Sequence, residues 1–96
     1  MIKHCIIVKW NEKVTDKAAF IPDIKRIFDG TLSLSGVEKV ELFRSVTDRP
    51  NRYDLMIAVT MEQSTLPDYD ASAPHAEWKK TYSPFIESKA IFDFEI

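Results

Sequence analysis

The sequence contains little cysteine and little glycine. Cys5 is the only cysteine in 96 residues, so the chain can form neither an internal disulfide nor a paired-cysteine zinc or redox motif. Gly30 and Gly36 are the only glycines, which excludes a glycine-rich phosphate-binding loop. The two histidines have no recognised metal-ligand spacing with the acidic residues. We therefore expect no metal and no cofactor, and the lack of disulfides favours a cytoplasmic location.

The sequence also lacks an excess of charge and a long apolar run. Thirteen basic and fifteen acidic side chains give a formal net charge of −2, so we expect no nucleic-acid partner, which would require clustered cations. The longest apolar run, from Cys5 to Val8, is too short to cross a membrane, and the first residues do not resemble a signal peptide. Hydrophobic residues nevertheless make up 45% of the chain, which suffices for one folded domain over residues 1–96.

Hydrophobic periodicity predicts four strands and three helical segments. Alternating apolar residues predict strands over Ile2–Trp10, Val37–Val46, Tyr53–Met61 and Lys89–Ile96. Helical spacing predicts a helix between the first two strands, a short helix from Ser64 to about Ala71, and a further helix from Pro74 to Pro84. The resulting order of strand, helix, strand, strand, helix, strand is typical of an α+β, ferredoxin-like split βαβ fold with an antiparallel sheet.

The first predicted helix has an ambiguous beginning. Thr15 is a plausible N-cap, with Asp16 in the first turn. Pro22 then either kinks this helix or marks its true first turn, because an interior proline loses a hydrogen bond and clashes with the preceding turn. Leu32 and Leu34, in the loop that follows, are both candidates for burial.

With both helices on one face of the sheet, the opposite face has no cover. It would expose apolar side chains such as Cys5, Ile7, Met56 and Ala58. Because a monomer rarely leaves such a patch in contact with water, we expect a homodimer in which two sheets pack face to face around a two-fold axis.

Four segments resemble the stress-responsive A/B barrel (Dabb) domain. They are the opening strand KHCIIVKW (residues 3–10), YDLMIAVTME (53–62), YDASAPH (69–75) and the closing AIFDF (90–94). The resemblance covers essentially the whole chain, including the spacing between elements. One position departs from the family pattern, since Ser72 stands where the family has its first motif histidine, and the proline follows one place later at Pro74. The resemblance implies a dimeric α/β barrel formed by two chains.

The resemblance also implies a candidate catalytic trio. In plant polyketide cyclases of this family, the residues matching His4, Tyr69 and His75 line a cavity between sheet and helices and take part in catalysis. His4 could instead be a core histidine with one satisfied partner, His75 a capping or packing residue at a helix start, and Tyr69 a half-buried packing residue. We expect the positive end of the helix dipole to keep His75 neutral.

These residues leave two classes of function open. The first is a module that binds a small apolar or aromatic molecule between sheet and helices. The second is a cofactor-free enzyme, similar to a cyclase or monooxygenase, in which a histidine abstracts a proton next to a carbonyl and Tyr69 steadies the enolate oxygen. The expected lining of the pocket is Ile6, Val8, Ile24, Phe28, Ile57, Val59 and Trp78. For residues at helical spacing, plain core packing is the alternative.

Overall fold

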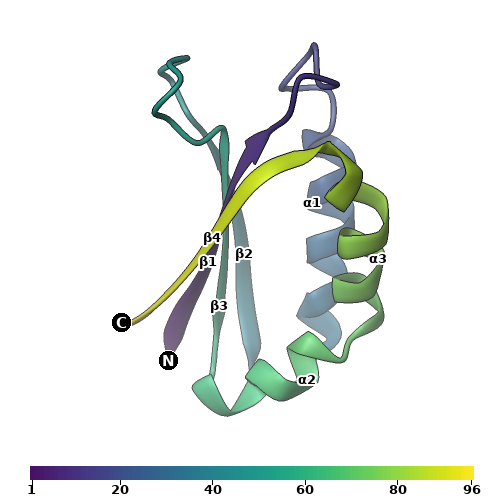
Figure 1. Cartoon of the computed structure of the whole chain (residues 1–96). Helices are drawn as coiled ribbons and strands as arrows, with labels where there is room; N and C mark the ends of the chain where they lie inside the picture. Colours follow the sequence, from purple (N-terminus) through teal and green to yellow (C-terminus); the bar gives the residue numbers. More distant parts are fainter.

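A computed structural model describes all residues, 1–96, and contains the predicted succession of elements (Figure 1). The strands are β1 (Ile2–Trp10), β2 (Val37–Arg44), β3 (Leu55–Met61) and β4 (Ile86–Glu95). The helices are α1 (Ile21–Asp29), α2 (Leu66–Asp70) and α3 (Ala73–Tyr82), with short 3₁₀ turns at Gly30–Ser33, Gln63–Thr65 and Ser83–Phe85. The fold is therefore ferredoxin-like α+β.

The four strands form one antiparallel sheet in the order β2-β3-β1-β4. β1 is central, and its Ile6 pairs with Ile57 of β3 on one side and with Ile91 of β4 on the other. The first and last strands are thus neighbours, and the two chain ends lie close together in Figure 1. The backbone N–H of Ile96 donates a hydrogen bond of 3.1 Å to the carbonyl of Met1.

All the helices lie on one side of the sheet, which we call the helix face (Figure 1). Strand alternation directs Ile2, His4, Ile6, Val8 and Trp10 towards them. The four apolar side chains among them pack with the apolar stripe of α1, which contains Ile24, Ile27 and Phe28, in a single buried core. Burial of this one contiguous core is the main stabilising contribution to the fold.

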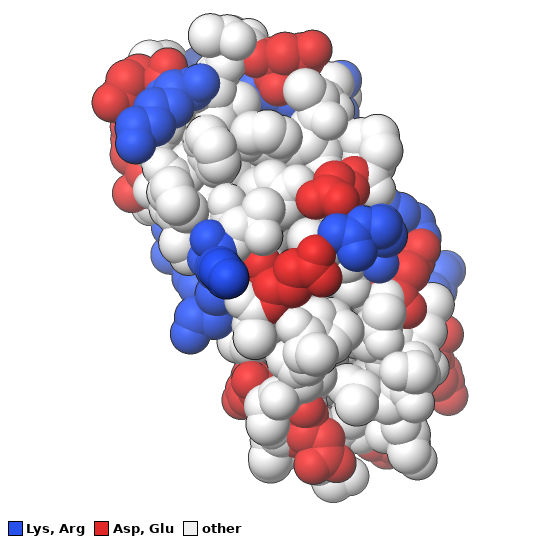
Figure 2. Space-filling model, turned by 90° about the vertical axis from the view of Figure 1, so that its right-hand side faces the viewer, with Lys and Arg blue, Asp and Glu red and all other residues white.

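The outward surface of the helical layer is charged and mixed in sign. Figure 2 shows acidic and basic side chains next to each other across this surface, with uncharged atoms between them. Arg26 of α1 forms one such contact with Glu77 of α3, at 2.6 Å. None of the helices combines the length and the apolar character needed to span a bilayer.

The opposite side of the sheet, which we call the open face, has no element packed on it in the protomer. Phe43, Phe92 and Phe94 are exposed there to 49%, 63% and 40%. Cys5 lies on this face, opposite in direction to His4, and is buried between its neighbours. The prediction of an uncovered apolar face is therefore confirmed for the single chain, but Cys5 and Ala58, which we expected to be exposed there, are only 4% and 2% exposed.

Three local predictions were wrong. Thr15 does not cap a helix: Asp16 instead accepts a hydrogen bond from the backbone N–H of Ala18, which forms a local turn, and α1 begins at Ile21 with Pro22 in its first turn. Leu32 is 44% exposed, because the 3₁₀ turn directs Thr31 inward in its place. The last strand also begins three positions earlier than predicted, at Ile86.

Candidate functional site

His4 is held at the centre of the sheet by a carboxylate on the neighbouring strand. In the register of β1 with β4, His4 lies directly opposite Asp93. Its Nδ1 is 2.5 Å from Asp93 Oδ1, and the imidazole is almost fully buried while the carboxylate is 42% exposed. In the neutral imidazole, an Nδ1–H donated to Asp93 leaves Nε2 as the hydrogen-bond acceptor.

Tyr69 lies next to His4, on the short helix α2. Its side chain has no exposed surface, and its hydroxyl is buried with no hydrogen-bond partner. The Tyr69 ring meets the His4 ring edge-on at a centroid distance of 5.1 Å, and it lies at the same distance from the ring of His75. Tyr69 is therefore the central member of the predicted trio, and the structure brings all three side chains together.

His75 is placed by the junction between α2 and α3. Ser72 is the N-cap of α3, and its hydroxyl accepts a hydrogen bond of 3.3 Å from the backbone N–H of His75. The same hydroxyl donates to the carbonyl of Tyr69 at 2.7 Å. Ser72 thus fixes the backbone between Tyr69 and His75.

Burial keeps both Tyr69 and His75 uncharged at neutral pH. It is the main cause that raises the pKa of Tyr69 well above its usual range, with smaller effects from Asp70 and Asp93. Burial likewise lowers the pKa of His75, with help from Lys79 and Lys89 and against the effect of Asp70. The predicted neutral His75 is consistent with this direction, although burial rather than the helix dipole is the main cause. The site therefore offers a phenolic donor beside an imidazole that can accept a proton.

Asp93 was not predicted as a site residue. A sequence signal for it existed, because it is the only charged residue in the apolar stretch AIFDF of the last strand. Its contact with His4 depends on the strand register, which places the two residues opposite each other.

The side chains expected to line a pocket are instead part of the packed core. These seven are Ile6, Val8, Ile24, Phe28, Ile57, Val59 and Trp78, each no more than 2% exposed. The hollows of the protomer lie on the open face and beside the loop that joins β2 to β3, and none is lined by these seven or by the trio. Apolar side chains close-pack between sheet and helices. A binding role for the seven thus stays a prediction that requires the core to open.

The structure contains no group of three or more His, Cys, Asp or Glu side chains arranged to hold a metal ion.

Comparison with solved structures gives full-length matches at low sequence identity. A dimeric protein of unknown function with a ferredoxin-like fold from Bacteroides fragilis superposes with a TM-score of 0.79 at 17% identity, covering 99% of this chain and 95% of that chain. A Dabb family protein from Mesorhizobium loti gives a TM-score of 0.74 at 17% identity, with coverage of 99% and 95%. This chain has the fold of a Dabb protein.

An enzyme has a fold similar to that of this chain. The hydroxynitrile lyase from Passiflora edulis matches with a TM-score of 0.73 at 16% identity, covering 99% of this chain and 92% of that chain. No protein-family model and no curated protein sequence matches the chain. The structural matches support the resemblance to the Dabb domain, and at these identities they establish the fold.

Proposed function

We propose that this chain forms a homodimer that binds a small apolar or aromatic molecule, bearing a carbonyl group, at the trio of His4, Tyr69 and His75. One observation carries the proposal: the Tyr69 hydroxyl is buried without a partner. Leaving a buried polar group unpaired costs about 1–3 kcal/mol, so this hydroxyl is unfavourable unless something accepts its hydrogen bond. A carbonyl oxygen is the natural acceptor, because the raised pKa keeps the phenol protonated.

The ligand has a plausible route to the trio along β4. Ile91 and Asp93 point to the helix face, yet Ile91 is 51% exposed and the Asp93 side chain 42%. The helices therefore leave this part of β4 uncovered. His75 is half-buried at the beginning of α3, on the other side of Tyr69. We propose that a ligand approaches Tyr69 past the solvent-exposed side chains of Ile91 and Asp93.

The homodimer is supported by the apolar open face and by the dimeric state of the Bacteroides fragilis protein. Burying exposed Phe43, Phe92 and Phe94 against a second copy would remove apolar surface from water, the usual driving force for association. Sedimentation velocity at micromolar concentration tests this part directly. A monomer would contradict it.

A second candidate is cofactor-free catalysis of proton transfer next to the carbonyl. The His4–Asp93 pair and the lowered pKa of His75 favour it, since they supply an oriented imidazole and a neutral one. In this scheme His75 takes the proton, Tyr69 donates to the enolate oxygen, and His4 relays or orients. Fold alone does not choose between binding and catalysis, because one fold hosts many functions.

Acetophenone, an aromatic ketone, is a suitable probe for both candidates. Binding is followed by the NMR shifts of the Tyr69 and His75 side chains, and we expect Tyr69→Phe to weaken it while Tyr53→Phe, on the other side of the sheet, does not. Exchange of the acetophenone methyl protons in heavy water above the buffer rate would show proton abstraction, and His75→Gln should abolish it. Binding of acetophenone without exchange of its methyl protons would favour a binding role over catalysis. Binding that Tyr69→Phe leaves unchanged would contradict the proposed site.

A further inference from the structure

The open face contains an apolar hollow that the trio does not use. Its volume is about 310 Å³, within the size range of small-molecule sites. Small side chains form its floor: Cys5 on β1 and Ala58 on β3 lie side by side and are only 4% and 2% exposed. Large side chains stand around them, notably Phe43, Phe92 and Phe94, while Lys3 lies at one end.

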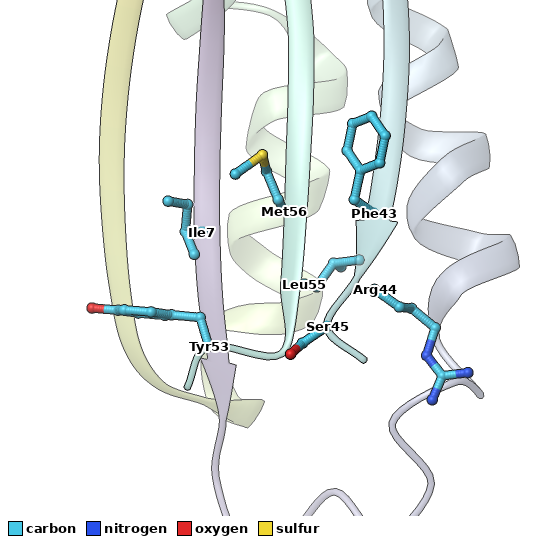
Figure 3. Close-up of a pocket in the computed structure, with 7 residues that line it drawn as sticks. All are labelled: Ile7, Phe43, Arg44, Ser45, Tyr53, Leu55 and Met56. Carbon is cyan, nitrogen blue, oxygen red and sulfur yellow. The ribbon is translucent and has the colours of Figure 1, made fainter. Parts of the chain in front are cut away.

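A second hollow of about 240 Å³ continues the first towards the β2–β3 loop. The two share Ile7, Met56 and Phe43, which stand on the open face from three adjacent strands (Figure 3). Tyr53 lies beyond Ile7 at the loop end of the sheet. The hollows together form a continuous apolar trough that runs along the strands.

Next to Lys3, at one end of this trough, lie two buried polar atoms that make no hydrogen bond, one of which forms an ion pair with Lys3. Thr60 lies directly opposite Lys3 in the β1–β3 register, is 6% exposed, and its Oγ1 makes no hydrogen bond. Glu41 Oε1 is also buried without a hydrogen bond, 3.5 Å from Lys3 Nζ. Both groups lie on the open face, where an apolar surface alone would leave them unsatisfied.

We propose that the trough is a second binding site, for an apolar molecule that carries one hydroxyl group. The apolar body would occupy the space above Cys5 and Ala58, and the hydroxyl would lie at the Lys3 end. A hydroxyl fits because it can donate to Glu41 and accept from Thr60 or Lys3, whereas an ether lacks the donor and a carboxylate would repel Glu41. Lys3 is 33% exposed and Glu41 23%, so both side chains have room to move aside.

A second copy of the chain would enclose this ligand rather than compete with it. When two open faces meet around a two-fold axis, two troughs face each other and form one closed apolar chamber. The enclosure rests on the homodimer of the proposed function, whereas the recognition groups belong to the single chain.

The test compares n-octanol with its isomer n-heptyl methyl ether, which has the same atoms but no hydroxyl donor. Binding to the wild-type dimer is followed by NMR shifts of the Ala58 and Ile7 methyl groups on the open face and of the Tyr69 ring on the helix face. We expect octanol to shift the open-face signals and to bind about two- to ten-fold more tightly than the ether, the effect of about one hydrogen bond.

Two variants identify the site. Thr60→Val keeps the side-chain shape but removes a hydroxyl that donates to the ligand oxygen, so it should weaken octanol binding by about two- to ten-fold. Thr15→Val, in an exposed loop, is the control and should leave octanol binding unchanged. Ala58→Phe fills the hollow and should abolish binding of both molecules, with circular dichroism confirming that the variant remains folded and sedimentation velocity that it remains a dimer.

The outcomes separate this site from the proposed function. Octanol shifts confined to Tyr69, equal affinity for the two probes, or no shift at all in a confirmed dimer would each overturn the second site. A monomeric protein that still binds octanol on the open face would refute the homodimer and leave the second site standing.

Discussion

Replacing Tyr69 by phenylalanine should make the unliganded protein more stable. The Tyr69 hydroxyl is fully buried and unpartnered, so its removal relieves a desolvation penalty without breaking a hydrogen bond. Tyr82 provides the matched control in the same protein. It is also buried, but its hydroxyl donates a hydrogen bond of 2.6 Å to Asp23. Tyr82→Phe should therefore be destabilising, and the two substitutions should have opposite signs.

The expected magnitudes follow from the environment of each hydroxyl. An unpaired buried polar group costs about 1–3 kcal/mol, and since phenylalanine leaves a small void, we expect a net gain of about 1 kcal/mol for Tyr69→Phe. Tyr82→Phe should lose about 0.5–1.5 kcal/mol, because its acceptor Asp23 is 44% exposed and can turn to water. For a domain of this size, 1 kcal/mol corresponds to a shift in Tm of about 4–8 °C.

Thermal and urea denaturation, followed by circular dichroism, measure both effects. The protein concentration must be held constant, because the stability of a dimer depends on it. A loss of stability in Tyr69→Phe comparable with that of Tyr82→Phe would refute the reasoning, since it would mean that the Tyr69 hydroxyl makes a bond in solution. A gain in stability together with lost acetophenone binding would instead mark Tyr69 as a residue kept for function.

Three further predictions concern pH, backbone conformation and capping. Because the folded-state pKa of His75 lies below its usual value of 6.5, the free energy of unfolding should decrease as the pH falls below about 6.5. His75→Gln should reduce this decrease when the midpoint of urea unfolding is measured against pH, and an unchanged pH dependence would contradict the prediction. Gly36→Ala should lower the free energy of unfolding by at least about 1–3 kcal/mol, because Gly36 has φ +96° and a Cβ there would lie 2.1 Å from Thr65 Oγ1. Gly30→Ala is the control and should cost less, so equal losses of Tm in the two variants would refute this prediction. Ser72→Ala removes the N-cap of α3 and should lower the free energy of unfolding, measured in urea, by about 0.5–2 kcal/mol. Ser64→Ala, at an exposed position, is the control, and equal effects of the two substitutions would show that the Ser72 cap does not stabilise the fold.

The fold could be predicted from the sequence because most helices and strands have a clear local pattern of apolar residues. Alternation in β1 and β3 placed the same residues on the helix face and the open face as the structure does. The beginning of α1 could not be settled in this way, since Thr15 and Asp16 suit a turn and a helix start equally well. The exposure of Leu32 also escaped prediction, because it depends on the direction of a single 3₁₀ turn.

The candidate site was predictable only in part. The resemblance to the Dabb domain selected His4, Tyr69 and His75. In the structure the centre of the Tyr69 ring lies 5.1 Å from the centre of each histidine ring. Asp93 depends on strand register, a long-range property that hydrophobic periodicity does not contain. The unpartnered state of Tyr69 depends on packing in three dimensions, and no spacing of residues indicates it.

The adjacency of the two chain ends has a consequence for how the protein could be rearranged. His4 and Asp93 are separated by 89 positions in the sequence, yet their side chains are in contact because β1 and β4 are neighbouring strands. At the ends of these strands, the backbone N–H of Ile96 donates a hydrogen bond to the carbonyl of Met1. A circular permutant that joins these ends through a short linker and opens the exposed β2–β3 loop would turn this contact into a hairpin-like one. Because local contacts close faster than distant ones, the permuted chain should form its His4–Asp93 pair earlier in folding than the original chain does.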